Sequence, residues 1–323
     1  MKRLIVSIPA YNEEKNIRDV ILSIPKQIGG VGDMRIIVVN DGSTDATLEK
    51  IQDLDIDIIQ HKKNQGLGKS FRDAVDRALA LRADAMVNID GDGQFDANDI
   101  PRLLMPIFRG EADFVSASRF VEKRDIPHMS KLKYAGNSCV TRMVNTILGR
   151  KFTDVSCGFR AYSREALLRL NLFGNFTYTQ ETFLDMSAKG VRMAEVPIEV
   201  KYFPERRSRM AKSIPRYAWR SFKIIFRTAR DYKPLKVFGG MGIFLFVVGC
   251  VLDVGLLVYF LYAGTFSPYK IVGFAGGFLN IVGIMIFFIG LVADMLFRIR
   301  MNQEEILYRL KKEENGRDET PNT

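Results

Sequence analysis

Short apolar runs alternate with longer stretches of helical periodicity through the first part of this 323-residue chain, and this alternation restricts the fold more than any other feature. The runs are rich in Val and Ile and are too short for buried helices, which indicates strands buried on both faces. They cover residues 4–8, 35–39, 57–60, 85–89 and 114–117. Helices are expected between them at residues 14–26, 44–53, 67–81 and 97–109. Strands that alternate with helices predict an α/β domain with a mostly parallel sheet.

The stretch after residue 117 is less regular. Helices are expected at residues 130–148, 164–170 and 182–189, and a further strand at residues 196–202. This part is therefore expected to complete the same domain rather than to repeat its first half.

Two acidic loops follow two of the apolar runs. Residues 40–45 (NDGSTD) come directly after the second run, and residues 90–94 (DGDGQ) come after the fourth. The carboxyl ends of parallel strands are where open α/β sheets bind ligands. Two carboxylates one residue apart in a glycine-rich turn can both face a divalent cation, and a diphosphate needs such a hard cation to mask its charge. The loops therefore predict a metal-assisted diphosphate site.

The ordered motifs of the chain resemble those of family 2 glycosyltransferases with a GT-A (Rossmann-like) fold. The likeness rests on residues 9–14 (PAYNEE), the two acidic loops, residues 118–119 (SR) and residues 157–160 (CGFR). Each motif alone is unspecific, whereas their order over roughly residues 1–235 is specific. The most similar subgroup is that of the polyprenyl-phosphate glycosyltransferases, the enzymes similar to dolichol-phosphate mannose synthase.

This resemblance implies an inverting membrane glycosyltransferase. Such an enzyme moves a hexose from a UDP- or GDP-linked donor to a polyprenyl phosphate, which is dolichyl or undecaprenyl phosphate. The product is a lipid-phosphate-sugar that serves as donor for glycan or glycoprotein assembly.

The metal ligands implied by the resemblance lie in the second acidic loop. Asp92 is the first candidate for metal binding and catalysis, with Asp90 and Gln94 contributing directly or through water. Oxygen ligands suit Mg²⁺ or Mn²⁺ and argue against zinc. The metal would stabilise the leaving nucleoside diphosphate as a Lewis acid. His61 and His128 are too few and too scattered for a histidine-based metal site.

The resemblance also implies a pocket for the nucleotide-sugar, in which Asp41 contacts the base or the ribose. The rest of the nucleoside pocket consists of Pro9, Tyr11 and Glu13. A carboxylate accepts hydrogen bonds from the N–H of uracil or from the N1–H and amino group of guanine, so Asp41 does not choose between these bases. Glu181 could bind a donor-sugar hydroxyl or could be an ordinary carboxylate at the start of a helix, and the sequence leaves both readings open.

The acceptor phosphate is anionic near neutral pH, so it can attack the anomeric carbon without a general base. The protein must instead hold two anions close together, which calls for cations. The resemblance assigns this role to Arg119 and, just before the membrane, to Arg206 and Lys212. Lys133 stands where the family often has an arginine, and a lysine lacks the bidentate guanidinium fork. Arg160 could bind phosphate or brace its loop.

Two long apolar stretches lie near the end of the chain, at residues 237–263 and 271–297. Each is long enough to cross roughly 30 Å of hydrocarbon, and the short link between them predicts a helical hairpin. Residues 201–236 contain twelve Lys or Arg and two acids, an excess equal to the formal +10 of the whole chain. Basic charge beside a span favours the cytoplasmic side, where both termini and the catalytic domain are therefore expected. This position explains the charge better than nucleic-acid binding does.

These features divide the chain into four expected parts. They are a GT-A catalytic domain at residues 1–205, a basic juxtamembrane segment at 206–235, two transmembrane helices within 236–300 and a charged cytoplasmic tail at 301–323. Residues 214–230 are expected to form a helix in the membrane interface.

Asp253 and Asn280 lie about 24 and 25 Å from the cytoplasmic ends of their spans, so they are expected to meet within the hairpin or between protomers.

Other functions remain open. A family 2 transferase that extends a lipid-linked glycan would need a sugar-acceptor groove and a base, whereas the basic segment favours a phosphate acceptor. A non-catalytic, membrane-anchored nucleotide-sugar-binding protein would not need the intact loop 90–94. Residues 66–70 (GLGKS) suggest an ATP-binding loop, but Lys63 stands where that motif needs Gly. The resemblance also implies a homo-oligomer, and it identifies neither the donor sugar nor the lipid length.

Overall fold

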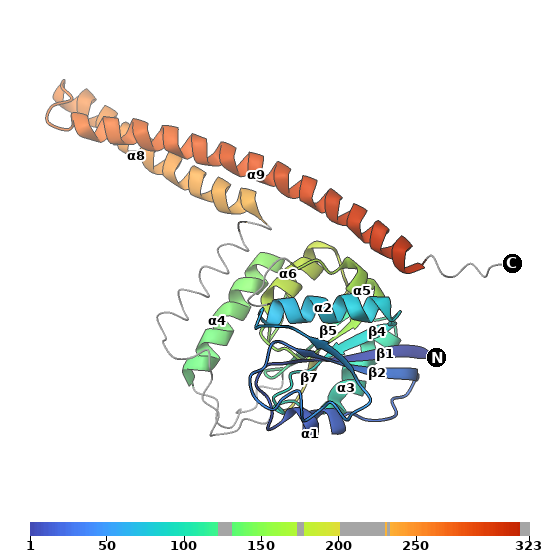
Figure 1. Ribbon diagram of the computed structural model, residues 1–323. Helices are drawn as coiled ribbons and strands as arrows, with labels where there is room; N and C mark the ends of the chain where they lie inside the picture. Colours follow the sequence, from blue (N-terminus) through green and yellow to red (C-terminus); the bar gives the residue numbers. More distant parts are fainter. Residues whose placement is uncertain (122–130, 173–177, 201–229, 231–232, 317–323) are drawn as a thin grey trace. The chain divides into compact units, whose positions relative to one another are not determined.

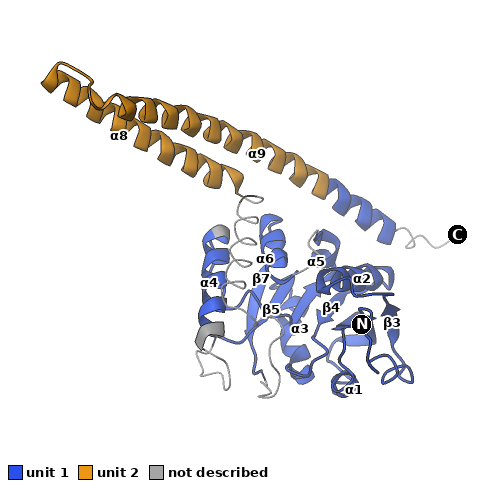
Figure 2. Ribbon diagram, turned by 60° about the vertical axis from the view of Figure 1, so that its left-hand side comes forward, with its two compact units in different colours: residues 1–221, 305–323 blue, residues 222–304 orange. Residues whose placement is uncertain are grey.

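The computed structural model describes residues 1–121, 131–172, 178–200, 230 and 233–316. These residues belong to two compact units. The first unit contains Met1–Ser221 together with Glu305–Thr323, and the second contains Phe222–Glu304 (Figure 2). The first unit is therefore discontinuous in the sequence, and its two pieces flank the apolar segment.

The first unit is built on a seven-stranded sheet whose strands have the order β3-β2-β1-β4-β6-β5-β7 (Figure 1). Four pairs of neighbouring strands are parallel, and only the two pairs that involve β6 are antiparallel. The mostly parallel sheet expected from the sequence is confirmed. The strands are β1 (Lys2–Ala10), β2 (Val31–Asn40), β3 (Asp57–Gln60), β4 (Ala85–Asn88), β5 (Phe114–Ser118), β6 (Arg160–Ser163) and β7 (Met193–Pro197).

Strand β6 was not expected from the sequence. It inserts between β4 and β5, so β5 does not pair directly with β4 as a simple βαβ repeat would suggest. Its four residues begin with an arginine and show no run of β-branched residues, and the sequence pattern therefore contains no strand signal. The insertion brings the segment that ends at Arg160 against the carboxyl-terminal part of β4.

Helices cover both faces of the sheet (Figure 1). Alternate residues of β1, such as Leu4, Val6 and Ile8, join one buried cluster with residues of α1 and α3. On the other face, Phe71 of α2 stacks on Tyr178 with ring centroids 4.1 Å apart. The helices are α1 (Ile17–Leu22), α2 (Leu67–Ala80), the 3₁₀ turn η1 (Ala97–Asp99), α3 (Ile100–Phe108), α4 (Lys131–Leu148), α5 (Arg164–Arg169) and α6 (Thr179–Ala188).

The helix expected at residues 44–53 is wrong, because this segment consists of turns. The carboxylate of Asp45 accepts hydrogen bonds from the backbone N–H of Thr47 and from the backbone N–H of Glu14. The hydroxyl of Thr47 in turn accepts the backbone N–H of Glu13 at 2.8 Å. Such side-chain bonds to the backbone compete with helix formation, and here they join the segment to the loop after β1.

Two apolar helices make up most of the second unit. The π-helical turn η2 (Leu235–Gly239) leads into α8 (Gly240–Ala263), which is followed by α9 (Lys270–Gly316). Both are long and apolar enough to cross a membrane, with mean hydropathies of 2.6 and 2.3 in their most apolar windows. The expected second span, residues 271–297, lies within α9, and this helix continues to Gly316. The interfacial helix expected at residues 214–230 lies, except for its last residue, outside the described residues.

The hairpin is joined by a close glycine seam and one polar pair. A Cβ atom on Gly242 would lie 2.6 Å from the carbonyl oxygen of Gly283, and one on Gly249 would lie 2.7 Å from that of Gly276. Glycines seven residues apart keep to one seam of a helix pair, as the heptad spacing requires. The expected contact of the two polar residues is confirmed, since Asn280 Nδ2 donates to Asp253 Oδ2 at 2.7 Å.

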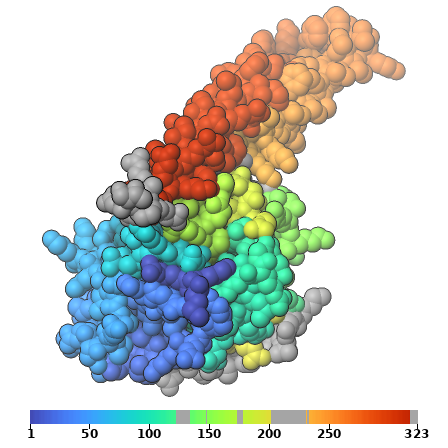
Figure 3. All heavy atoms as spheres, turned by 90° about the vertical axis from the view of Figure 1, so that its right-hand side faces the viewer, coloured from blue at the N-terminus to red at the C-terminus, as the bar shows by residue number. Residues whose placement is uncertain are grey.

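The last turns of α9 belong to the first unit and contact α5 (Figure 3). The Tyr308 hydroxyl donates to Glu165 Oε2 at 3.0 Å, and Lys311 Nζ donates to the carbonyl oxygen of Leu170 at 3.1 Å. The guanidinium of Arg169 lies 4.2 Å from the Tyr308 ring centroid, which is cation–π geometry. The start of the charged tail is therefore part of the first folded unit, a role that its composition does not indicate.

Candidate active site

The candidate site lies at the carboxyl ends of three neighbouring strands. Because β2, β1 and β4 are parallel and adjacent, the loops that follow them meet at one edge of the sheet. The backbone N–H of Asp41 donates to the carbonyl oxygen of Ala10 at 2.9 Å, and the backbone N–H of Ile89 donates to the carbonyl oxygen of Ser7 at 3.0 Å. Pro9, at the end of β1, lies buried between these loops. The sheet thus brings the two acidic loops and the first motif together, as expected.

The loop after β1 is tied to the loop after β2 by reciprocal hydrogen bonds. Asn12 adopts a positive φ of 56°, a conformation that Asn tolerates better than most residues do. Its backbone N–H donates to Ser43 Oγ at 3.0 Å, and its side-chain oxygen accepts the backbone N–H of Thr44 at 2.8 Å. Tyr11, which is 36% exposed, and the half-buried Glu13 flank Asn12 in this loop. The expected nucleoside residues therefore share one hydrogen-bonded frame.

Asp41 is enclosed by hydrogen-bond donors and is only 4% exposed. Its Oδ1 atom is 2.7 Å from His61 Nδ1 and accepts the backbone N–H of Gln65 at 2.8 Å. Its Oδ2 atom accepts the backbone N–H of Gly66 at 2.9 Å. Gly42, next in the chain, has a φ of 68° and leaves no room for a side chain, because a Cβ atom would lie 2.5 Å from the carbonyl carbon of Lys63.

His61 is a site residue that the sequence analysis missed. Its sequence context argues against a histidine-based metal site and gives it no other role, whereas in the structure it bridges two carboxylates. Its Nε2 atom is 2.9 Å from Asp73 Oδ2, and Asp73 also pairs with Lys69 one helical turn away. The available signal was the position of His61 directly after β3, whose end neighbours the end of β2 in a parallel sheet.

The second acidic loop holds two crowded carboxylates. The backbone N–H of Gln94 donates to Asp92 Oδ1 at 3.0 Å and closes the turn. Desolvation, and then the neighbouring charge of Asp92, raise the pKa of Asp90 to about 7. The guanidinium groups of Arg160 and Arg119 oppose this rise, and the carboxylate of Glu13 adds to it. Asp90, Asp92, Glu13 and Arg119 are therefore electrostatic neighbours in the folded chain.

This donor set fits a divalent cation. A carboxylate whose pKa is raised by desolvation and by a neighbouring carboxylate, as that of Asp90 is, is stabilised when a cation lies between the two. Their oxygen chemistry suits Mg²⁺ or Mn²⁺. Within the described parts of the chain, no group of three or more His, Cys, Asp and Glu residues could hold a metal by itself. A cation here would therefore take its remaining ligands from elsewhere, such as Gln94, water or a bound diphosphate.

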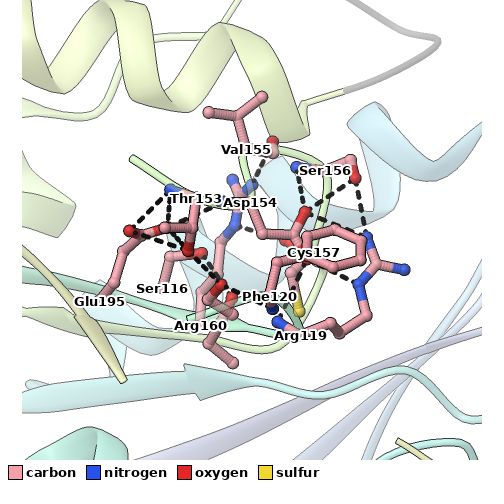
Figure 4. Close-up of polar contacts among 12 residues, drawn as sticks. Ser116, Arg119, Phe120, Thr153, Asp154, Val155, Ser156, Cys157, Arg160 and Glu195 are labelled. Carbon is pink, nitrogen blue, oxygen red and sulfur yellow. Dashed lines mark hydrogen bonds and ion pairs between the residues drawn. The ribbon is translucent and has the colours of Figure 1, made fainter. Parts of the chain in front are cut away.

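Arg119 is held at the site by an ion pair (Figure 4). Its Nε atom donates to Asp154 Oδ2 at 2.6 Å, and one terminal nitrogen donates to Asp154 Oδ1 at 3.0 Å and to Ser156 Oγ at 2.8 Å. Asp154 is fully buried and Arg119 is 11% exposed at the side chain. Desolvation alone would raise the pKa of Asp154, but the charge and hydrogen bond of Arg119, together with the hydrogen bonds of Ser156, outweigh it and lower the pKa. Asp154 is a positioning residue that the sequence analysis did not identify.

The structure resolves the two alternatives for Arg160 in favour of a brace. The side chain is fully buried, and its donors reach three backbone carbonyl oxygens. These belong to Cys157 at 2.8 Å, Val155 at 3.1 Å and Thr179 at 2.8 Å. The braced loop includes Gly158, where a Cβ atom would lie 2.8 Å from Asp90 Oδ2. Arg160 therefore braces the loop that lies against Asp90.

The remaining candidates are placed only in part. Glu181 is half-buried in the first turn of α6, and this position leaves both of its readings open. Lys133 lies in the first turn of α4, but the described structure does not include its side chain. Arg206 and Lys212 lie outside the described residues.

The family of the chain follows from comparison with known proteins. Residues 5–170 match the family described as Glycosyl transferase family 2. The chain belongs to this family. The match includes both acidic loops, Arg119 and the braced loop that ends at Arg160.

Relatives and solved structures agree with this assignment. Glycosyltransferase AglJ of Haloferax volcanii is 27% identical over 310 residues, which cover 94% of this chain and 96% of the relative. A UDP-N-acetylglucosamine–dolichyl-phosphate N-acetylglucosaminyltransferase of Methanococcus voltae is 28% identical over 221 residues, covering 62% and 86%. The crystal structure of glucosyl-3-phosphoglycerate synthase from Mycobacterium tuberculosis with Mn²⁺, UDP and phosphoglyceric acid has a TM-score of 0.53 at 21% identity, covering 69% of this chain and 78% of that chain. The catalytic unit therefore has a GT-A fold.

Proposed function

We propose that this family 2 glycosyltransferase moves a sugar from a nucleotide-sugar to a polyprenyl phosphate, with inversion at the anomeric carbon. The observation that carries the proposal is the meeting of the crowded pair Asp90 and Asp92 with the ion-paired cation Arg119 at one edge of the sheet. One part of this arrangement suits a metal-bound diphosphate, and the other suits a second anion beside it. The relative from Methanococcus voltae is named for transfer to dolichyl phosphate, and this name supports the same acceptor class.

The proposed reaction is one displacement. An oxygen of the acceptor phosphate forms a bond to the anomeric carbon, while the bond from that carbon to the donor diphosphate breaks. The electron pair of the broken bond leaves with the nucleoside diphosphate, and no proton needs to be removed from the attacking phosphate. A bound Mg²⁺ or Mn²⁺ would act as a Lewis acid toward the leaving diphosphate.

Each part of the reaction has residues proposed for it. Asp92, Asp90 and Gln94 would hold the cation, and Glu181 would bind the donor sugar. The nucleoside would lie against Pro9, Tyr11, Glu13 and Asp41. Arg119 would bind the acceptor phosphate, together with Lys133, Arg206 and Lys212.

The membrane arrangement is also part of the proposal. Residues 1–205 would form the catalytic domain, residues 206–235 a basic segment on anionic headgroups, and residues 237–263 and 271–297 the two spans. Residues 301–323 would remain on the same side as the catalytic domain. The basic residues beside the first span favour the cytoplasm for this side. A homo-oligomer of this membrane form is expected.

The test is transfer of radiolabelled sugar from a panel of UDP- and GDP-sugars into an organic-extractable polyprenyl phosphate. The full-length protein in detergent should label the lipid in the presence of Mg²⁺ or Mn²⁺, and EDTA should abolish labelling. Asp92→Asn should lower the rate at least about 100-fold, the scale found when one transition-state electrostatic group is lost. Asp96→Asn is the matched control, because Asp96 caps η1 and Asn caps helices equally well.

The outcomes separate this function from its rivals. Labelling of a lipid-linked glycan, with none of the lipid phosphate, would indicate a transferase that extends glycans. Binding of nucleotide-sugar without transfer to any acceptor would indicate a non-catalytic protein. Normal transfer by Asp92→Asn in saturating Mn²⁺ would refute the proposed metal site.

A further inference from the structure

Most hydrogen-bond acceptor positions of the Asp41 carboxylate are occupied by donors of the protein itself. A carboxylate offers about four acceptor positions, two on each oxygen. Three are filled, because Oδ1 meets His61 Nδ1 and the backbone N–H of Gln65, while Oδ2 accepts the backbone N–H of Gly66. Among the described residues, Asp41 thus retains one acceptor position, on Oδ2, for a ligand donor.

His61 occupies the acceptor position on Asp41 Oδ1 that decides how many donors of a base Asp41 can accept. Both of its ring nitrogens face carboxylates, Asp41 at 2.7 Å and Asp73 at 2.9 Å, and its side chain is only 6% exposed. An ionised carboxylate only accepts hydrogen bonds, so Nδ1 is the donor in the contact with Asp41. This bond and the two backbone N–H bonds fix the Asp41 carboxylate in one orientation. Lys69 also pairs with Asp73.

Uracil and guanine make different demands on such a carboxylate. The pairing edge of uracil presents one donor, N3–H, between two carbonyl oxygens. Guanine presents two donors side by side, N1–H and the exocyclic amino group, and satisfies both only with two free acceptor positions. A donor left unpaired in a desolvated pocket weakens binding by an order of magnitude or more.

We propose that His61 makes Asp41 a selector for uracil, so that the donor is a UDP-sugar and not a GDP-sugar. This inference rests on the proposed function, because it concerns the base of the same nucleotide-sugar. His61 is a positioning residue in this proposal and acts through Asp41. The loop from His61 to Gly66 is fixed to the selector, since it is bonded to Asp41 and its backbone packs on Gly42.

The test is calorimetric titration of the full-length protein in detergent with UDP and with GDP, both in the presence of Mn²⁺. UDP should bind the unmodified protein at least about tenfold more tightly than GDP. Two variants separate the roles of the two ring nitrogens. The amide of His61→Asn can replace the Nδ1 donor to Asp41, and the amide of His61→Gln can replace the contact of Nε2 with Asp73.

The two variants should differ in nucleotide selectivity. His61→Asn should keep the preference for UDP, whereas His61→Gln should weaken UDP binding about fivefold or more and reduce the UDP-to-GDP ratio below about threefold. Asp73→Asn is the matched control, because its amide can still form a hydrogen bond with Nε2 and leaves the contact with Asp41 intact. A merely structural role of His61 would lower the melting temperature and move both nucleotide affinities together, with the ratio unchanged.

Each result has a definite meaning. GDP that binds as tightly as UDP would overturn the selector while leaving the proposed function intact. A UDP-to-GDP ratio that His61→Gln leaves unchanged would overturn the part assigned to His61. Absence of binding by either nucleotide, with the protein folded by circular dichroism, would refute the proposed function itself.

Discussion

Replacement of Gly158 by alanine tests whether the braced loop shapes the metal site. A Cβ atom at this position would lie 2.8 Å from Asp90 Oδ2 and 3.0 Å from Oδ1, whereas ordinary contacts begin near 3.4 Å. The backbone of Gly158 is not in the left-handed region, so alanine adds a steric effect without backbone strain. The carboxylate of Asp90 must therefore shift by about 0.6 Å or turn away from the loop.

A shift of this size should be visible in catalysis more than in stability. Misplacement of a reacting group by 1 Å can cost about 100-fold in rate, so the shift of Asp90 should lower the transfer rate roughly tenfold. The assay is radiolabel transfer at increasing Mn²⁺ concentration, with Mn²⁺ affinity measured separately by calorimetry. Gly29→Ala is the matched control, because a Cβ atom there meets nothing within 4 Å. Normal Mn²⁺ affinity and a normal rate in Gly158→Ala would refute the placement of Asp90 against this loop.

Three further predictions concern other parts of the chain. Asp154→Asn should destabilise the protein by about 3 kcal/mol in thermal unfolding, because Arg119 loses its buried partner, and an unchanged unfolding midpoint would contradict the pairing. Because pairing lowers the pKa of Asp154, the stabilisation by this pair is complete above the ordinary Asp pKa and is lost as the pH falls through the pKa of the folded state. Burial raises the pKa of Cys157 to about 12, so maleimide at pH 8 should label the exposed Cys139 and leave Cys157 unmodified in peptide mass spectra. Gly249→Ile should separate the helices of the hairpin, because even a Cβ atom there would lie 2.3 Å from the side-chain oxygen of α9 that it faces, and a cysteine crosslink between α8 and α9 should then form more slowly.

The sheet was predictable where burial produces a clear pattern. The runs that became β1, β2 and β4 are apolar because both of their faces are covered, and the carboxylates that follow them mark the ligand edge. The strand β6 has no such pattern, because its first residue is a buried arginine whose donors reach carbonyl oxygens of the loop just before it and of Thr179 in α6. Tertiary hydrogen bonds of this kind leave no periodic trace in a sequence.

The residues of the candidate site could be predicted from their positions in the sequence, but the partners that orient them could not. Asp90, Asp92 and Arg119 could be named because their motifs are local in the sequence. The partners that orient the site are distant, since His61 lies 20 residues after Asp41 and Asp154 lies 35 residues after Arg119. The contact between Asp253 and Asn280 could be foreseen only because two antiparallel helices of known rise place equal depths side by side.

The discontinuity of the first unit affects how the enzyme can be made soluble. Ending the chain before residue 222 would remove Tyr308 and Lys311, and with them their hydrogen bonds to Glu165 and Leu170 of the catalytic unit. The apolar hairpin is topologically an insertion, because the polypeptide on both of its sides belongs to the same folded unit. Replacement of residues 222–304 by a flexible linker should therefore give a better behaved soluble enzyme than C-terminal truncation, since it removes the apolar surface and retains the whole of the catalytic unit.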